Sequence, residues 1–276
     1  MRRVLTKSTS YFILTAVSVM MIFPLLWMAL SAFKSGNEMF ATPLVWLPKV
    51  WHWEHFAEGF RLAPFATYLF NSFFTAAVIV FVQIGLSCLI AYGLTQMKFR
   101  GQGLLFQSLL VTYMLPAAVT YVPSYVILAR MGLLDSLTGI IISNIGSVFS
   151  IFLLRQAFLK VPGEVIEAAR CEGAGDLAIL WRVMLPMARS TILTLSMITF
   201  VEMYNNYMWP SLIVKSPSKY LITVGLNQFF TQQGTFTNQW PLIMAVSTVA
   251  VLPLLLIFFI FQKWFIKGIS DSGLKG

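Results

Sequence analysis

The polar stretch from Val161 to Pro186 lies between two apolar segments and holds the group of side chains best suited to chemistry in this chain. Glu164 and Glu167 fall where the first turns of a helix would lie, and carboxylates suit the positive end of a helix dipole. Gly173 can adopt a positive φ and end that helix, and Asp176 can cap a second one. The stretch therefore predicts a helix, a sharp turn and a second helix. A simpler alternative is a solvated loop in which Glu167 pairs with Arg170.

Two prolines bound this predicted pair of helices. Pro162 suits a first helical position, because its missing N–H would have no intrahelical partner there. Pro186 should limit the second helix at Leu185, since the residue before a proline avoids the helical region. The stretch also contains three small side chains, those of Ala168, Ala169 and Ala174. They would let its backbone approach a groove closely.

A second group of polar side chains interrupts a later apolar run. Glu202 is the only acidic residue inside a predicted membrane span, and Asn205 and Asn206 follow it within one turn. Uncompensated polar groups at that depth are costly, so these should face a bundle interior or water. They would then either line a translocation path or form hydrogen bonds that hold helices together. Pro210 should bend this span near its outer end.

Catalytic and metal-binding chemistries have little support in the sequence. His52 and His55 lie three residues apart in a tryptophan-rich segment, which is weak evidence for a metal site. The dipeptide Gly-Lys does not occur, so the sequence has no phosphate-binding P-loop. The Gly-x-Ser-x-Gly and His-Glu-x-x-His patterns are absent as well. We therefore expect no catalytic residue, no metal site and no cofactor on this chain.

The composition places the chain in a lipid bilayer. Of its 276 residues 58% are hydrophobic and 11% are charged, whereas soluble domains carry about 25% charged residues. Apolar runs near the roughly 20 residues that a helix needs to cross a bilayer predict an all-α integral membrane protein with six transmembrane helices. The predicted spans are 11–33, 68–94, 104–127, 137–158, 191–213 and 241–262.

The distribution of basic residues predicts the orientation. With residues 1–10 in the cytoplasm, thirteen of the nineteen Lys and Arg residues fall on the cytoplasmic side. This excess follows the positive-inside rule. It places the 159–190 loop of the 11–262 transmembrane domain, and a tail at 263–276, in the cytoplasm. The net charge of +9 is then a signature of topology, and no nucleic-acid partner is expected.

Three features of the spans carry further expectations. Asn71 opens the second span and should cap it. Pro116 and Pro123 should break the third span. The fourth span should present a small-residue face for close helix packing, formed by Gly139, Ser143 and Ser147 at four-residue intervals.

The polar stretch resembles a known motif, the EAA loop of the inner-membrane permeases of binding-protein-dependent ABC importers. In that family the loop docks into an ATPase subunit on the cytoplasmic side. The resemblance implies that ATP and Mg are bound by partner ATPase subunits and not by this chain. It also implies a set of residues that couple the chain to such a subunit: Glu167, Ala168, Ala169, Glu172, Gly173, Ala174, Leu185 and Pro186.

Two other segments resemble the same family. The run from Phe200 to Pro210 resembles its Trp-Asn-x-Tyr/Phe-x-Trp-Pro signature, with Tyr204 where tryptophan is common. The ending, from Phe261 to Gly276, resembles that of the smaller permease of maltose-type carbohydrate importers. The resemblance implies a translocation path lined by Glu202, Asn205 and Asn206.

The family resemblance implies an assembly in the inner membrane of a bacterium, with both termini of this chain in the cytoplasm. Its other members would be a second homologous permease, two ATPase subunits and a periplasmic or lipid-anchored solute-binding protein, and this chain would also contact membrane lipid. The solute would be a carbohydrate or a polyol-like molecule. The alternative is an ion-coupled secondary transporter driven through Glu202, which gives no reason for the pattern around Glu167 and Glu172.

Single cysteines at Ser218, Asn238 and Gly175 test the predicted orientation in a variant lacking Cys88 and Cys171. An impermeant thiol reagent applied to intact cells should label the first two, because the charge distribution places them outside, and should leave the third unlabelled. All three should react in permeabilised cells. Labelling of the Gly175 position from outside would contradict both the orientation and the docking role of the loop.

Overall fold

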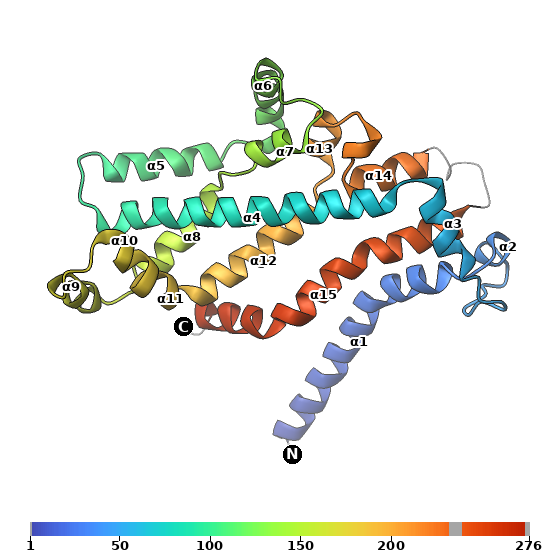
Figure 1. The fold of residues 1–276 in the computed structure, drawn as a ribbon. Helices are drawn as coiled ribbons and strands as arrows, with labels where there is room; N and C mark the ends of the chain where they lie inside the picture. The colour runs from blue at the N-terminus through green and yellow to red at the C-terminus, as the bar shows by residue number, and fades with distance from the viewer. Residues whose placement is uncertain (1, 232–238, 274–276) are drawn as a thin grey trace. The chain divides into compact units, whose positions relative to one another are not determined.

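The computed structural model describes residues 2–231 and 239–273, and this part of the chain consists of helices and loops without a β-strand. The predicted all-α fold is therefore confirmed. The chain divides into two compact units, Met1–Ala66 with Val224–Pro253, and Thr67–Thr223 with Leu254–Gly276. Figure 1 shows the order of the helices. The position of Asn238 lies outside the described residues.

Three helices are each long and apolar enough to cross a bilayer without a break. They are Thr9–Ser31 within α1 (Arg2–Ser31), all of α4 (Phe65–Gln96), and Trp240–Gln262 within α15 (Trp240–Gly273). They match the first, second and sixth predicted spans. Because α15 continues as a helix to Gly273, the predicted tail at 263–276 begins as a continuation of the span.

Six candidate spans are reached only if each of three bent helix pairs counts as one span, and two of these pairs coincide with the predicted spans 104–127 and 137–158. The first pair, α5 (Gln102–Tyr113) and α6 (Ala117–Arg130), is bent by 103°. The pair α7 (Leu137–Ser143) and α8 (Val148–Phe158) is bent by 46°. In the third pair, Asp176–Met187 and α12 (Arg189–Asn205) meet at 79°. Only α12 overlaps the predicted span 191–213, because Asp176–Met187 lies in the loop 159–190 that was predicted to be cytoplasmic.

The break in the third predicted span lies at Pro116 and not at Pro123. Pro116 is the N-cap of α6, where the missing N–H disturbs no helical bond. Pro123 lies inside α6, which continues to Arg130. A proline inside a helix removes one backbone hydrogen bond, and α6 remains helical through Pro123 on its other backbone hydrogen bonds.

The expected small-residue face on the fourth span is wrong, because the helix is interrupted within it. Ser147 is the N-cap of α8, and its hydroxyl accepts from the Ser150 N–H at 3.2 Å. Ser143 ends α7 and accepts from the indole N–H of Trp209 at 2.8 Å. A Cβ on Gly139 would lie 2.2 Å from the carbonyl oxygen of Leu133, so this glycine admits its own preceding loop and not a neighbouring helix.

The first unit contains α2 (Gly36–Met39), α3 (Glu54–Leu62) and a cluster of aromatic rings. Phe33 contacts the rings of Trp51, Trp53 and Phe56 at centroid distances of 5.0, 4.7 and 5.2 Å. Lys34 is fully buried beside this cluster: its ammonium lies 3.7 Å from the centroid of a Trp27 ring and donates to the Val45 carbonyl at 2.8 Å. The tryptophans of this loop thus pack against their own segment.

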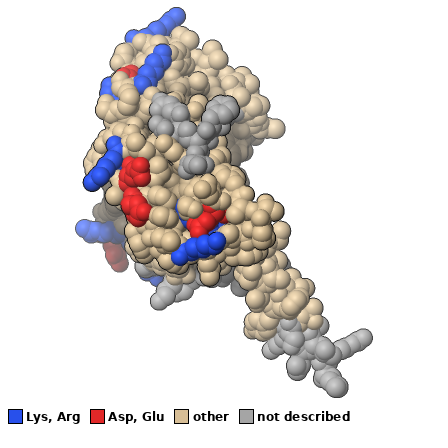
Figure 2. Space-filling view, turned by 90° about the vertical axis from the view of Figure 1, so that its right-hand side faces the viewer, with Lys and Arg blue, Asp and Glu red and all other residues tan. Residues whose placement is uncertain are grey.

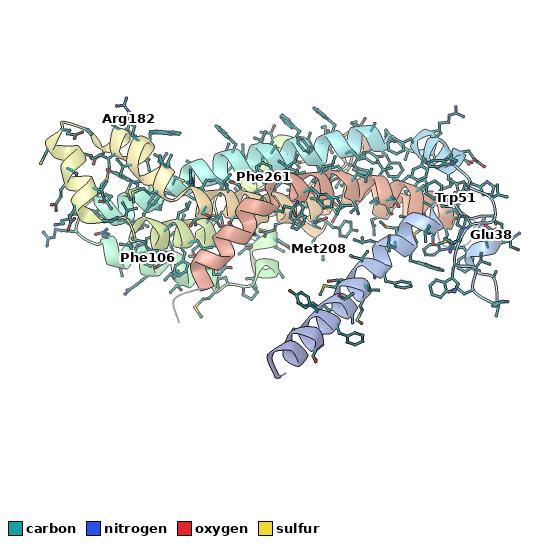
Figure 3. All side chains as sticks on the ribbon, turned by 90° about the horizontal axis from the view of Figure 1, so that it is seen from below. Glu38, Trp51, Phe106, Arg182, Met208 and Phe261 are labelled. Atoms are coloured by element: carbon teal, nitrogen blue, oxygen red, sulfur yellow. The ribbon has the colours of Figure 1, made fainter. Side chains whose placement is uncertain are left out.

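Apolar cores hold the described helices of the second unit together. One joins α4 to α8 and the 159–190 segment, and another joins α7 to α13 (Met208–Ile213). α8 also packs against α5, where the Phe106 and Phe152 rings stack at 6.3 Å and the Arg155 guanidinium lies 4.2 Å from the Phe106 centroid (Figure 3). These two cores hold the segments that carry the candidate functional residues.

Charged side chains are sparse on the outside of the molecule. The face shown in Figure 2 is almost entirely uncharged, with a few scattered Lys, Arg, Asp and Glu side chains. Large apolar side chains are instead exposed, and on α1 Phe12 is 75% exposed. In water such a surface would aggregate, whereas lipid acyl chains or another apolar helix can cover it.

Candidate functional site

The 159–190 segment folds as a helix, a sharp turn and a second helix, as the sequence predicted. α9 (Gly163–Cys171) ends at a turn in which Gly173 has a φ of +83°, and α10 (Asp176–Ile179) follows. Backbone bonds of 3.0 Å close the turn, from the Gly173 N–H to the Arg170 carbonyl and from the Ala174 N–H to the Ala169 carbonyl. A Cβ on Gly173 would meet open space, so the glycine is required for its backbone angle and not for room.

The ends of these helices differ slightly from prediction. Pro162 is the N-cap of α9 and not its first residue, and Gly175 is the N-cap of α10, with Asp176 as the first helical residue. The carboxylate of Asp176 bonds to other parts of the segment and does not cap the helix. Its acceptor is Oδ1, which lies 3.3 Å from Nη2 of Arg170 and 2.8 Å from the hydroxyl of Tyr92, the donor in each case being the partner. Arg170 therefore pairs with Asp176, and not with Glu167 as the alternative of a solvated loop had it.

Pro186 does not stop the second helix at Leu185. A π-helical turn, η1 (Leu180–Met184), follows α10 and leads into α11 (Leu185–Met187). At the end of this turn the Leu185 N–H bonds to the Leu180 carbonyl, five residues back. Pro186 then lies at the start of α11, directly after this π-helical turn. The shift in register explains how the helix passes a proline.

The predicted coupling residues lie on two faces of the segment. Glu167, Ala168, Glu172, Gly173 and Pro186 are exposed. The remaining three are partly buried against the apolar core that includes α4, and they are Ala169, Ala174 and Leu185. The motif therefore combines an outward face with an inward face that fixes the segment to the second unit. Figure 1 shows α9 and α10 of this segment near the left end of α4.

The segment around Glu202 is broken before its proline. α12 ends at Asn205, and Asn206 leaves the helix with φ −66° and ψ 124° before α13 begins at Met208. The Asn206 carbonyl accepts from the Thr223 hydroxyl at 2.8 Å. Pro210 is therefore not the point of the bend, as the sequence had predicted. It lies in the first turn of α13, where its missing N–H costs no helical bond.

The three predicted path residues lie close together along the chain at this break. Glu202 and Asn205 are exposed and Asn206 is half-buried. None of the three lies in the interior of this chain's own helices. At membrane depth, irregular backbone and polar side chains are tolerated only beside protein or water. The arrangement can therefore contact a polar solute or the surface of another subunit.

Asn71 does not cap the second span, because α4 begins at Phe65 and Asn71 lies in its second turn. Its side-chain amide donates to the carbonyls of Ser218 and Tyr220, at 3.0 Å each. The neighbouring Ser72 hydroxyl accepts from the Ile222 N–H at 2.7 Å. These bonds fix the 218–222 segment to α4, a role that spacing along the sequence cannot reveal because the partners lie about 150 residues away.

Comparison with protein families now bears on this arrangement. The model of the binding-protein-dependent transport system inner membrane component matches residues 83–271, which contain both the 159–190 segment and the break at Asn206. The chain belongs to this family. It is thus a transmembrane permease subunit of a binding-protein-dependent ABC importer, and the ion-coupled alternative is not needed.

Individual relatives agree with the family. The sn-glycerol-3-phosphate transport system permease protein UgpE of Yersinia enterocolitica is 32% identical over 260 residues, which cover 92% of each chain. The UgpE protein of Brucella abortus is 27% identical over 98% of each chain. Among solved structures, a bacterial ABC transporter involved in the import of the acidic polysaccharide alginate has a chain of the same fold. That chain has a TM-score of 0.85 at 21% identity and covers 95% of this permease.

The histidine pair of the permease makes local contacts. Nδ1 of His52 lies 2.6 Å from Oε1 of Glu54, and Nδ1 of His55 lies 2.9 Å from the Ala32 carbonyl oxygen. The two imidazole rings stack at 5.1 Å. Within residues 2–231 and 239–273, no group of three His, Cys, Asp or Glu side chains is placed to hold a metal ion.

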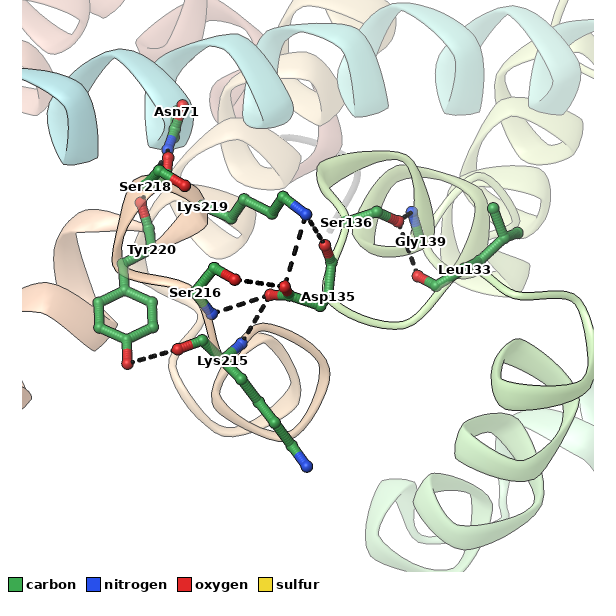
Figure 4. Close-up of polar contacts among 10 residues, drawn as sticks. All are labelled: Asn71, Leu133, Asp135, Ser136, Gly139, Lys215, Ser216, Ser218, Lys219 and Tyr220. Atoms are coloured by element: carbon green, nitrogen blue, oxygen red, sulfur yellow. Dashed lines mark hydrogen bonds and ion pairs between the residues drawn. The ribbon is translucent and has the colours of Figure 1, made fainter.

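Asp135 forms a polar cluster that sequence reasoning missed (Figure 4). Its Oδ1 accepts from the N–H groups of Lys215 and Ser216, at 2.9 Å each, and its Oδ2 accepts from the Ser216 hydroxyl. The Lys219 ammonium donates to the Asp135 carbonyl and lies 3.5 Å from Oδ2. Asp135 has a φ of +49°, a rare angle for a non-glycine residue but one that aspartate tolerates. The cluster joins the α6–α7 loop to the loop after α13.

The pKa of Asp135 lies well below its usual range, because the Ser216 hydroxyl and the Ser216 and Lys215 N–H groups bond to the carboxylate. A lowered pKa stabilises the fold above the unfolded value of about 4, and this contribution is lost as the pH falls toward the folded value. Asp135→Asn should therefore lower the Tm of the purified permease at pH 7, and its difference from wild type should shrink below about pH 4. Glu58→Gln, at an exposed carboxylate, provides the control in the same melting experiment. Equal Tm values for Asp135→Asn and wild type at pH 7 would contradict this role.

Proposed function

We propose that this permease moves a carbohydrate or a polyol-like solute across the inner membrane of a bacterium, powered by partner subunits that bind ATP and Mg. The solute class is supported by the names of its relatives, which transport sn-glycerol 3-phosphate, and of its structural neighbour, which imports alginate. These solutes share hydroxyl groups and a negative charge. The permease itself would provide the path and not the chemistry of ATP hydrolysis.

The observation that carries the proposal is the outward face of the 159–190 segment. Beside the exposed Glu167 and Gly173, this segment exposes large apolar side chains: Leu177 and Trp181 are 66% and 67% exposed, and Val165 is 41% exposed. A short polar loop gains nothing from exposing tryptophan to water, whereas a protein partner could bury these side chains. An ATPase subunit in the cytoplasm is the proposed partner, with both termini of the permease on the same side.

The full assembly would also contain a second homologous permease, a second ATPase subunit and a solute-binding protein. A periplasmic protein accompanies the transporter in a second structural neighbour, described as a bacterial alginate ABC transporter in complex with an alginate pentasaccharide-bound periplasmic protein. In the proposed cycle, closure of the ATPase dimer draws the two coupling loops together. The helices then rock between inward-facing and outward-facing states.

Glu202, Asn205 and Asn206 would line the path where the two permeases meet. The exposure of Glu202 and Asn205 on the single chain supports this position, because a polar break at membrane depth must lie beside water or protein. Amide and carboxylate groups can exchange hydrogen bonds with the hydroxyl groups of a sugar or polyol. The family signature around these residues then marks a polar lining and not a packing contact within the chain.

The coupling role can be tested with Gly173→Asp and Glu167→Lys. The first adds a Cβ at a φ of +83° and a charge beside Glu172, and the second reverses a charge that would contact a basic group of the ATPase. Breaking such a partly buried pair can cost about 3–5 kcal/mol. Both variants should insert into the membrane normally but lose ATPase subunits during purification, or lose solute-stimulated ATP hydrolysis.

Matched controls separate coupling from folding in this experiment. Gly101 also has a positive φ, +87°, with open space around it, so Gly101→Asp adds the same strain and charge outside the coupling segment. Glu58→Lys repeats the charge reversal on the side predicted to be outside. Both controls should retain ATPase subunits and uptake in vesicles. If the two loop variants also behave as wild type, the segment is only a connector and the coupling proposal fails.

The path residues can be tested by comparing Glu202→Gln and Asn205→Leu with Leu212→Ala. The two polar substitutions should lower solute uptake in vesicles by about fivefold or more, since removal of one polar contact to a solute commonly costs about 1 kcal/mol or more. The complex should still assemble with normal subunit stoichiometry. Loss of assembly in both variants would assign these groups to subunit contact, and normal uptake in both would remove them from the path.

A further inference from the structure

Tyr92 is a buried residue of α4 that bonds directly to the coupling segment. It is 3% exposed, and its hydroxyl donates to Oδ1 of Asp176 at 2.8 Å. The same oxygen accepts from the Arg170 guanidinium at 3.3 Å. One carboxylate therefore joins three helices, α4, α9 and α10, although Tyr92 and Asp176 are 84 residues apart in the sequence.

This hydrogen bond lies at an otherwise apolar contact. Cys88, Ala91 and Tyr92 of α4 share a core with Ile166 of α9 and with Ile179, at the end of α10. Apolar contacts have little directional preference, so a core of this kind allows one helix to rotate or slide against another. A phenol donating to a carboxylate is directional and charge-assisted. The bond therefore fixes the register between α4 and the coupling segment.

The other end of α4 has a polar anchor of its own. The Asn71 amide donates to the Ser218 and Tyr220 carbonyls, and the Ser72 hydroxyl accepts from the Ile222 N–H. Between Asn71 and Tyr92 the helix is unbroken, and at 1.5 Å per residue it is about 30 Å long. The neighbouring pairs α5–α6, α7–α8 and the pair before α13 are all bent. α4, by contrast, is a candidate span without a break.

We infer that Tyr92 is a positioning residue that locks α4 to the coupling segment. A displacement of that segment is then delivered along α4 to the Asn71–Ser72 anchor and to the 218–222 segment at the opposite end. This inference rests on the proposed coupling function and assigns the helix that transmits the movement. Tyr92 touches neither solute nor nucleotide and acts through Asp176.

Tyr92→Phe is the sharpest test, because it removes the hydroxyl and leaves the ring in the apolar core. In the complete importer reconstituted in vesicles, subunit stoichiometry and basal ATP hydrolysis should stay at wild-type values. The solute transported per ATP hydrolysed should fall by about tenfold or more, the scale expected for loss of one hydrogen bond to a charged group. Tyr113→Phe, at an exposed tyrosine on α5, should leave this ratio unchanged.

A second measurement follows the movement itself. In a background without native cysteines, the labelling rate of a cysteine at Ser218 should depend on ATP, and Tyr92→Phe should reduce this dependence. Asp176→Asn keeps an acceptor for Tyr92 and should be milder than Asp176→Ala. Combining Tyr92→Phe with Asp176→Ala should add no further loss, since both remove the same bond.

These measurements separate the positioning role of Tyr92 from the coupling function on which it rests. If Tyr92→Phe transports solute with the wild-type ratio, or if its effect adds fully to that of Asp176→Ala, the positioning role is wrong. Loss of ATPase subunits from the Tyr92→Phe complex would also overturn it, by assigning the bond to docking. When Gly173→Asp and Glu167→Lys still uncouple the importer, the proposed function survives such a result. When they do not, the proposed function itself fails.

Discussion

A lipid bilayer offers the peptide backbone no hydrogen-bond partners, so the chain must satisfy its own N–H and C=O groups wherever it lies in hydrocarbon. α4 meets this constraint by remaining a helix throughout its length. At several other interruptions, side-chain hydroxyl groups replace the missing helical bonds. Ser136 and Ser147 accept from the N–H groups that begin α7 and α8, and Thr223 donates to the carbonyl of Asn206. Hydroxyl groups thus close these three interruptions, whereas the N-caps of α6 and α12, Pro116 and Ala188, make no side-chain capping bond.

The same constraint explains why functional positions gather at interruptions. A continuous helix exposes only side chains, whereas a break exposes backbone and turns side chains away from the helical repeat. Gly173 reverses the chain between two short helices, and Asn206 turns it between α12 and α13. Both interruptions are costly in lipid, so they persist where water or another subunit can receive them. The coupling segment and the proposed path are the two places in this permease where that condition is expected.

Within the second unit, the unbroken helix and the bent helices have different roles. The bent helices place polar groups, and the straight α4 connects them. Its apolar side packs into the core with the 159–190 segment, while Tyr92 and Asn71 provide directional bonds near its two ends. The Asp135 cluster adds a further link, between the α6–α7 loop and the loop after α13. Movements of the coupling segment would therefore reach the far loops through packed helix and polar bonds together.

The sequence by itself determined the membrane class, the six apolar segments, the family and the helix–turn–helix at Gly173, because hydropathy and local backbone preferences depend on neighbours along the chain. Only the tertiary structure decided the partners of Asn71, Tyr92 and Asp135, which lie some 80 to 150 residues away. The structure also showed that the helix breaks at Asn206 and not at Pro210, and that the expected helix face that includes Gly139 does not form. A proline indicates where a helix can break, but long-range hydrogen bonds and packing decide where it does.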